Sequence, residues 1–138
     1  MENCIFCKII NKEVPSIKIY EDNNFLAILD IRPATKYGGH VLLMPKKHFE
    51  LITDLSDDLL SKCLIAIKKI SKALLKFGKG LNILQNNKKI AGQAIPHVHF
   101  HLIPRFPNDN VMVERWVSNE YGEGEAERVA AKIKSLLK

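Results

Sequence analysis

The sequence contains no long apolar run and few aromatic residues. Aromatic side chains make up 7% of the 138 residues, and there is a single tryptophan. No stretch approaches the roughly 20 apolar residues that cross a bilayer. The first residues, MENCIFCKIINKEV, lack the basic, apolar and small-residue segments of a secretory signal peptide. These absences exclude a helical membrane protein, and they predict a cytoplasmic protein with no membrane partner.

Blocks of like charge are also absent, although the formal net charge is +6. The lysines fall in short pairs such as Lys46-Lys47, Lys68-Lys69 and Lys88-Lys89. A nucleic-acid-binding tail would need a longer basic block, so we expect no nucleic-acid partner. Two readings of the charge remain: a solvated basic surface, or a surface that attracts small phosphate-bearing ligands.

Cysteine is scarce, with three residues in the chain. Disulfides are rare in the cytoplasm, and Cys63 lies on the apolar side of an expected helix, where it would be part of the core. Cys4 and Cys7 have the Cys-x-x-Cys spacing of half a zinc site. A redox pair normally follows a strand and begins a helix, so it is the weaker alternative, and free thiols without a metal are another. A zinc site needs two further ligands.

The order of the expected elements predicts the fold class. Residues 1–138 are long enough for one domain with a substantial core. Period and turn residues predict a short helix or turn at 4–11 and helices at 56–77 and 124–138. They also predict five strands, at 16–20, 25–31, 40–44, 80–86 and 97–103. This order lacks a regular strand–helix–strand alternation. We therefore expect an α+β domain, with an antiparallel sheet of about five strands, a long central helix and a C-terminal helix.

The most informative segment is His97-Val98-His99-Phe100-His101. Side chains alternate between the two faces of a strand, so the three imidazoles would share one face at a spacing of about 7 Å. Their ring nitrogens need hydrogen-bonding partners. Two functional interpretations follow: a metal-binding triad, or a nucleophile flanked by supporting groups.

Other motifs favour the second interpretation. Upstream lies the block Gly39-His40-Val41-Leu42-Leu43-Met44-Pro45-Lys46-Lys47-His48, and the alternating histidines are followed by Ile103-Pro104-Arg105. Together with Cys4-x-x-Cys7, this pattern resembles the histidine triad (HIT) family of nucleotide hydrolases and transferases, in its Hint-like branch. The resemblance runs from Cys4 to about Arg105.

The resemblance implies that His99 is the catalytic nucleophile. His99 would attack the α-phosphorus of a nucleotide conjugate, at a phosphoramidate or phosphoanhydride bond, and form a nucleotidyl-histidine. Water would then release the nucleoside monophosphate. A neutral imidazole is a competent nucleophile near pH 7. His101 would meet a phosphate oxygen or the leaving group, so it is expected to act in both catalysis and substrate binding.

The resemblance also implies how a substrate is bound. Asp30 would accept hydrogen bonds from the ribose hydroxyls, Asn86 would contact phosphate, and Gln93 would line the same pocket. His40 would support the triad from behind. A purine nucleotide or nucleotide conjugate is the implied ligand. A homodimer is implied as well, with the long helix or a sheet edge as the contact.

By the same resemblance, the metal is a structural zinc ion, one per chain. His48 and His97 would complete the site begun by Cys4 and Cys7. Four protein ligands leave no open position, so the chemical step itself requires no cofactor.

One position departs from the family pattern. Some members with strong phosphoramidase activity have Ser or Thr three residues before the first triad histidine, where this chain has Ala94. This departure concerns which bond is preferred. Two alternative functions remain: a metallohydrolase in which the triad holds a catalytic metal, and a nucleotide-binding scaffold or regulatory protein with vestigial catalysis.

Overall fold

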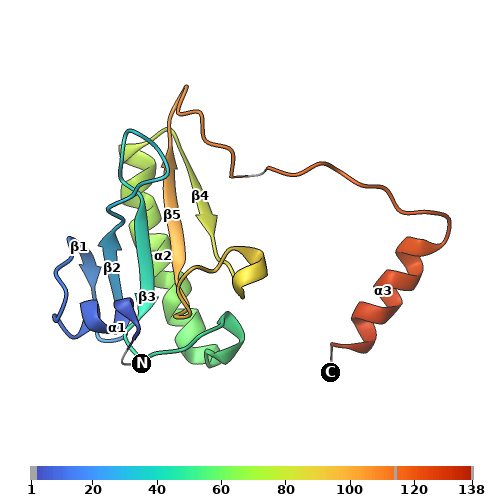
Figure 1. Ribbon diagram of the computed structural model, residues 1–138, viewed down its shortest axis with the longest axis horizontal. Helices are drawn as coiled ribbons and strands as arrows, with labels where there is room; N and C mark the ends of the chain where they lie inside the picture. Colours follow the sequence, from blue (N-terminus) through green and yellow to red (C-terminus); the bar gives the residue numbers. More distant parts are fainter. Residues whose placement is uncertain (1–2, 114, 138) are drawn as a thin grey trace.

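A five-stranded antiparallel sheet forms the body of the protein (Figure 1). The computed structural model describes residues 3–113 and 115–137. The strands follow the order β1-β2-β3-β5-β4 across the sheet. Their bounds are β1 Lys18–Glu21, β2 Phe25–Leu29, β3 Val41–Pro45, β4 Gly80–Leu84 and β5 Phe100–Arg105. The predicted α+β class is confirmed.

Three α-helices accompany the sheet: α1 Ile5–Ile10, α2 Asp57–Phe77 and α3 Glu125–Ser135. Single 3-10 turns occupy Ile52–Asp54 and Lys89–Ala91. The long helix α2 begins as its sequence predicts, because the Ser56 side chain accepts a hydrogen bond from the N–H of Leu59 at 3.1 Å. Among the described residues, no helix is both long and apolar enough to cross a bilayer.

The sheet has a separate apolar cluster on each face. Side chains alternate along β2 and β3, so neighbouring residues contribute to different clusters. The larger cluster packs against α2 and includes Phe25, Ala27, Val41, Leu43, Phe100 and Leu102. The smaller cluster packs against α1 and includes Cys4, Phe6, Leu26, Ile28, Leu42 and Met44. A helix of 21 residues covers the first face and one of 6 residues the second, so the second face is covered over a shorter length.

The histidine segment is less regular than its sequence predicts. We expected a strand over 97–103, but β5 begins at Phe100. The N–H of Val98 bonds to the carbonyl of Phe49 at 2.7 Å, outside the sheet ladder. The alternation nevertheless holds, because Val98 and Phe100 are buried while His101 lies opposite Leu42, on the α1 face. Side chains therefore alternate between the two faces even before Phe100, where the backbone does not yet make the hydrogen bonds of a strand.

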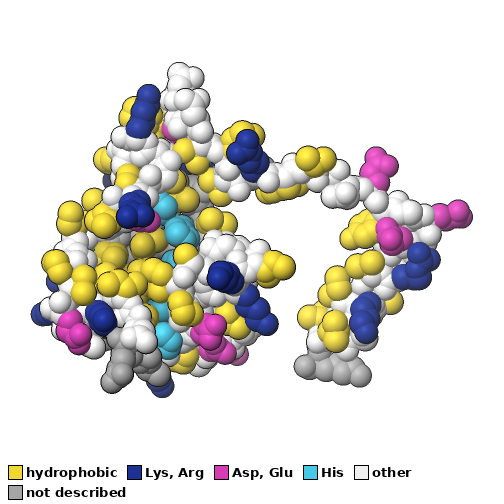
Figure 2. All heavy atoms as spheres, viewed as in Figure 1, with side chains coloured by type: hydrophobic (Ala, Val, Ile, Leu, Met, Phe, Trp, Pro, Cys, Tyr) yellow, Lys and Arg dark blue, Asp and Glu magenta, His cyan; other side chains and the backbone are white. Residues whose placement is uncertain are grey.

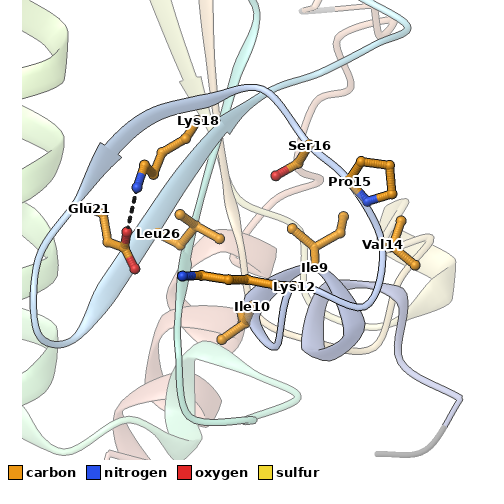
Figure 3. A pocket seen from close by; sticks show the side chains of 9 residues that line it. All are labelled: Ile9, Ile10, Lys12, Val14, Pro15, Ser16, Lys18, Glu21 and Leu26. Carbon is orange, nitrogen blue, oxygen red and sulfur yellow. Dashed lines mark hydrogen bonds and ion pairs between the residues drawn. The ribbon is translucent and has the colours of Figure 1, made fainter.

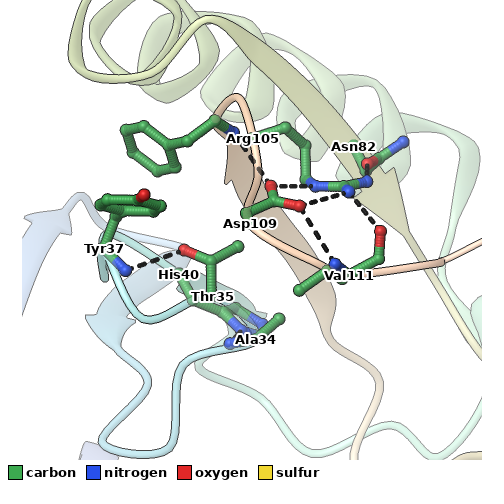
Figure 4. Close-up of polar contacts among 9 residues, drawn as sticks. Ala34, Thr35, Tyr37, His40, Asn82, Arg105, Asp109 and Val111 are labelled. Carbon is green, nitrogen blue, oxygen red and sulfur yellow. Dashed lines mark hydrogen bonds and ion pairs between the residues drawn. The ribbon is translucent and has the colours of Figure 1, made fainter.

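After β5 the chain leaves the body as a C-terminal arm, described over residues 106–113 and 115–137, which ends in α3 (Figure 1). No residue of α3 is buried. The start of the arm is fixed by Arg105, whose guanidinium donates to both carboxylate oxygens of Asp109 at 2.8 and 2.9 Å. The same guanidinium donates to Asn82 at 2.8 Å and to the carbonyl of Val111 (Figure 4). These bonds set the direction in which the arm departs.

We expect Asp109→Asn to loosen the arm without unfolding the body. The Arg105 guanidinium beside Asp109 holds the pKa of that carboxyl well below its usual range, so the pair is charged at neutral pH. An amide would remove the charge and one of the two acceptor oxygens. Limited proteolysis should therefore cut residues 106–124 faster in the variant.

The matched control is Asp58→Asn, which removes an exposed carboxylate paired with Lys62 at 3.0 Å. Exposed pairs of this kind contribute little, so its cleavage rate should equal that of the wild type. Equal cleavage rates in Asp109→Asn and the wild type would show that the pair does not hold the arm.

Candidate active site and metal site

All five histidines of the chain gather in one line on the α1 face of the sheet (Figure 2). Ring centroids are 4.8 Å apart for His48 and His97, 5.0 Å for His99 and His101, and 5.1 Å for His101 and His40. Segments far apart in the sequence supply them: the residue just before β3, the loop after β3, and the residues around the start of β5. The three triad histidines share a face, as the sequence predicts.

His99 is held with one ring nitrogen available for chemistry. Its Nδ1 lies 2.7 Å from the carbonyl oxygen of His97. A carbonyl only accepts, so Nδ1 carries the proton and Nε2 keeps its lone pair. Burial lowers the pKa of His99 below its ordinary value, against a smaller raising effect of the bond to His97. The ring is therefore neutral near pH 7, the state that a nucleophilic nitrogen requires.

Phe6 orients the same ring from the other side. Its edge meets His99 at a centroid distance of 5.0 Å and His97 at 5.8 Å. Phe6 belongs to the segment 4–11, and the sequence predicts no role for Phe6 in the site. Its contact with the histidines depends on where α1 packs, which no local pattern encodes.

Beyond His99, the line of rings continues to His101, His40 and Asp30. His40 Nε2 lies 2.9 Å from His101 Nδ1 and 3.7 Å from an Asp30 carboxylate oxygen. Burial lowers the pKa of His40, and burial followed by the neighbouring histidines lowers the pKa of His101 to about 4. Both rings are neutral at pH 7. Asp30 is half-buried, with its other oxygen accepting the N–H of Arg32 at 2.9 Å.

At the opposite end, four side chains could hold a metal ion: Cys4, Cys7, His48 and His97. Their ligand atoms all lie within 4.8 Å of one another. Tetrahedral zinc with ordinary Zn–S and Zn–N bonds places sulfur and nitrogen about 3.5 Å apart. The observed S···N distances fit this value: 3.4 Å for Cys4–His97, 3.3 Å for Cys7–His48 and 3.6 Å for Cys7–His97.

The tautomer of His97 also suits a ligand. Its Nε2 lies 2.8 Å from the carbonyl oxygen of Pro45, so Nε2 carries the proton and the Nδ1 lone pair faces the cysteines. Burial lowers the pKa of His97 to about 4 and raises that of Cys7 to about 11. The protein alone thus keeps the imidazole in the form that could bind a metal, whereas the Cys7 thiol would have to release its proton to solvent on metal binding.

The triad histidines do not converge on one ion. Within the described part of the chain, the groups close enough to bind a metal place His97 with the cysteines, and His101 with Asp30 and His40. His99 belongs to neither group. A metallohydrolase with three triad ligands therefore lacks the required geometry.

The two remaining predicted residues lie in the loop between β4 and the triad. Gln93 is buried, and both ends of its amide bond to backbone: Nε2 donates to the carbonyl of Glu50, and Oε1 accepts the N–H of Lys88, each at 2.7 Å. Asn86 Nδ2 lies 3.4 Å from the carbonyl of Gly92. Their contacts with substrate stay predictions.

A cavity of about 270 Å³ lies elsewhere, beside α1 and the β1–β2 hairpin (Figure 3). Its lining is Ile9, Ile10, Lys12, Val14, Pro15, Ser16, Lys18, Glu21 and Leu26. None of these is a predicted site residue, so this cavity and the histidine line are distinct places.

Known proteins are similar to this chain in sequence and in architecture. The HIT domain family model matches residues 11–108. Adenosine 5'-monophosphoramidase hnt1 of Schizosaccharomyces pombe is 38% identical over 136 residues, covering 99% of each chain. The crystal structure of a HIT family member from Bacillus subtilis has a TM-score of 0.89 at 37% identity, covering 99% of this chain and 98% of that one. A Zn-bound histidine triad family protein from Mycobacterium smegmatis has a TM-score of 0.73 at 33% identity, covering 98% of each chain. The chain belongs to the HIT family.

Proposed function

We propose that the protein is a cytoplasmic nucleotide hydrolase that cleaves phosphoramidate or phosphoanhydride bonds at the α-phosphate of purine nucleotide conjugates. The observation that carries this proposal is the 2.7 Å bond from His99 Nδ1 to the His97 carbonyl, which leaves the Nε2 lone pair for nucleophilic attack. Similarity to proteins named adenosine 5'-monophosphoramidase supports it.

The reaction proceeds by two displacements at phosphorus. In the first, His99 Nε2 forms a bond to the α-phosphorus, and the bond from phosphorus to the leaving nitrogen or oxygen breaks. The leaving group takes a proton from solvent, and the water that attacks in the second step returns one. In the second, water adds to the same phosphorus, the N–P bond breaks, and the nucleoside monophosphate is released. Neutral His99 is suited to both steps, since its unprotonated nitrogen attacks as a nucleophile and the ring leaves as a neutral imidazole.

Neighbouring side chains bind the substrate in this scheme. Asp30 accepts from the ribose hydroxyls, and His101 meets the phosphate beside His99. Asn86 approaches the phosphate from the β4 side, while Gln93 shapes the loop. His40 supports His101, with the two ring nitrogens 2.9 Å apart.

His99→Ala should abolish turnover, because the variant has no nucleophile. We expect kcat for adenosine 5'-phosphoramidate to fall by about ten-thousand-fold or more, as for other covalent catalysts that lose the attacking group. Because the N–P bond of a nucleotidyl-histidine is stable in alkali and labile in acid, quenching the wild type in alkaline denaturant should trap a covalent nucleotide that the variant never forms.

The control is Ile90→Ala, since Ile90 is 99% exposed on the adjoining loop and contributes little to packing. It should retain wild-type kcat. Turnover by His99→Ala within ten-fold of the wild type would refute His99 as nucleophile. A folded wild type that binds nucleotide without turnover would favour a scaffold role.

We also propose that the four-ligand site holds one structural zinc ion per chain. Zinc there would tie α1 to the end of β3 and to His97. The match of three S···N distances to tetrahedral geometry supports it. A closed site has no position for substrate, so the metal would supply stability and order.

Cys4→Ser should lose the bound metal and lower Tm by at least about 5 °C, since metal binding contributes folding free energy. Elemental analysis of purified protein should give one zinc per wild-type chain. Cys63→Ala is the matched control, because Cys63 lies in the α2 cluster and its loss should leave zinc content unchanged. Full zinc content in Cys4→Ser would count against this site.

Finally, we propose that the protein is a homodimer in which the C-terminal arm contacts the second copy. Val129, Ile133 and Leu136 of this segment are 36%, 54% and 71% exposed. A monomeric protein rarely leaves the apolar side of an amphipathic helix uncovered in this way. Figure 2 shows apolar side chains of α3 on its side nearer the body, across open space. The match to the Bacillus subtilis structure covers 99% of the chain and therefore includes the arm, which supports a fixed arm position.

Deleting residues 111–138 should convert the dimer into a monomer, because the apolar side of α3 is removed. Sedimentation equilibrium of the full and shortened chains measures this directly. Lys134→Ala, on the same helix, serves as a control that should remain dimeric. A full-length monomer at micromolar concentration, or an unchanged dimer after the deletion, would contradict the proposal.

A further inference from the structure

We propose that the backbone N–H of Ala34 positions the active site by fixing the ring proton of His101 on Nε2, acting through His40. The catalytic consequence rests on the proposed function. The proton positions themselves do not, and they can be measured in the free protein.

The first step is the bond from the Ala34 N–H to His40 Nδ1, at 3.0 Å. A backbone N–H can only donate, so His40 Nδ1 must hold a lone pair. His40 is a neutral ring in its buried setting and has one ring proton. That proton therefore lies on His40 Nε2.

The second step passes this assignment to His101. His40 Nε2 and His101 Nδ1 face each other at 2.9 Å, so one of them carries a proton and donates it while the other accepts. His40 Nε2 is the donor, so His101 Nδ1 is the acceptor. Asp30 does not compete, because its oxygen is 3.7 Å from His40 Nε2, beyond ordinary hydrogen-bond length. The proton of neutral His101 is left on Nε2.

The result is complementary to a phosphoryl group. His99 presents a lone pair to phosphorus, and the adjacent ring, 5.0 Å away, presents an N–H. Phosphoryl oxygens are acceptors, so this N–H binds the oxygen on which negative charge builds. The opposite tautomer of His101 would present a lone pair to the phosphoryl oxygens instead of an N–H, and this lone pair would repel them.

A hydrogen bond joins the two ends of the loop that carries Ala34, and this keeps the Ala34 N–H in place. Asp30 N–H bonds to the carbonyl of His40 at 2.8 Å, so the residues on either side of loop 31–39 are joined. Within the loop, Gly38 N–H bonds to the carbonyl of Thr35 at 3.1 Å, and Thr35 is buried. Gly39 has a φ of 81°, and a Cβ there would overlap Phe77. The positions of the ring protons on His40 and His101 thus depend on a loop backbone that is held by its own hydrogen bonds.

Nitrogen-15 NMR of the full chain tests the wild type first. Long-range correlations from ring carbon-bound protons distinguish protonated from unprotonated ring nitrogens. We expect protonated Nε2 in both His40 and His101, with a scalar coupling between His40 Nε2 and His101 Nδ1 across the hydrogen bond. Protonated Nδ1 in His101 would overturn the proposal without any variant.

Ala34→Pro then removes the donor, and Ala34→Gly keeps it as the matched control. Proline requires a negative φ, and Ala34 is not among the residues with a positive φ. We expect mixed tautomers of His40 and His101 in Ala34→Pro and the wild-type pattern in Ala34→Gly. His99 should stay protonated on Nδ1 in both, since its partner is the His97 carbonyl.

His40→Leu gives a second test should the proline variant fail to fold. It removes the donor to His101, so His101 should again show both tautomers. A pure Nε2-protonated His101 in either folded variant would overturn the relay from Ala34.

Activity adds a separate readout. In Ala34→Pro, kcat should fall by about five-fold, the equivalent of one hydrogen bond, while KM stays within about two-fold. A wild type without hydrolase activity but with the expected tautomers would refute the proposed function and leave the proton positions standing. An active wild type with the wrong His101 tautomer would refute the relay alone.

Discussion

The packing of Phe100 and Leu102 in the cluster against α2, with Val98 buried two residues earlier, is the constraint on which the rest of the site depends. All three are buried at 5% exposure or less, and they occupy every second position. With these side chains fixed in or beside the larger cluster, His97, His99 and His101 must face the opposite way. The three histidines therefore take their placement from apolar packing on the far side of the sheet.

Backbone carbonyls and amides then determine what each histidine can do. Pro45 and His97 offer carbonyls, which force a proton onto the facing nitrogen of His97 and His99 respectively. The Ala34 amide has the reverse effect on His40. Three chemically identical side chains acquire different properties because backbone groups of different polarity face them. Burial reinforces this by lowering their pKa values and keeping the rings neutral.

Much of this architecture could be predicted from the sequence. The period of α2, its Ser56 cap and the alternation after residue 96 are local signals, and each matched the structure. The pairing of Cys4 and Cys7 with His48 and His97 came from family resemblance, and these residues do lie together. Their roles, like those of Asp30, Asn86 and Gln93, stay predictions.

Other features left no sequence signal. The start of β5 was predicted three residues early, because alternating side chains resemble a strand even where the N–H of Val98 bonds outside the ladder. The contact of Phe6 with His99 depends on how α1 packs. The Ala34 amide could not be identified at all, since every non-proline residue has one and only the folded loop gives it a partner.

The double use of His97 has a consequence for how such a chain can change over generations. Its side chain faces the cysteines, but the group that orients His99 is its carbonyl, which any amino acid at that position would retain. Substitution of Cys4, Cys7, His48 or the His97 side chain therefore leaves in place the backbone group that sets the tautomer of His99. A chain of this fold that lost those side chains would keep the carbonyl that faces His99 Nδ1, whereas a change in the backbone course at residue 97 would remove it.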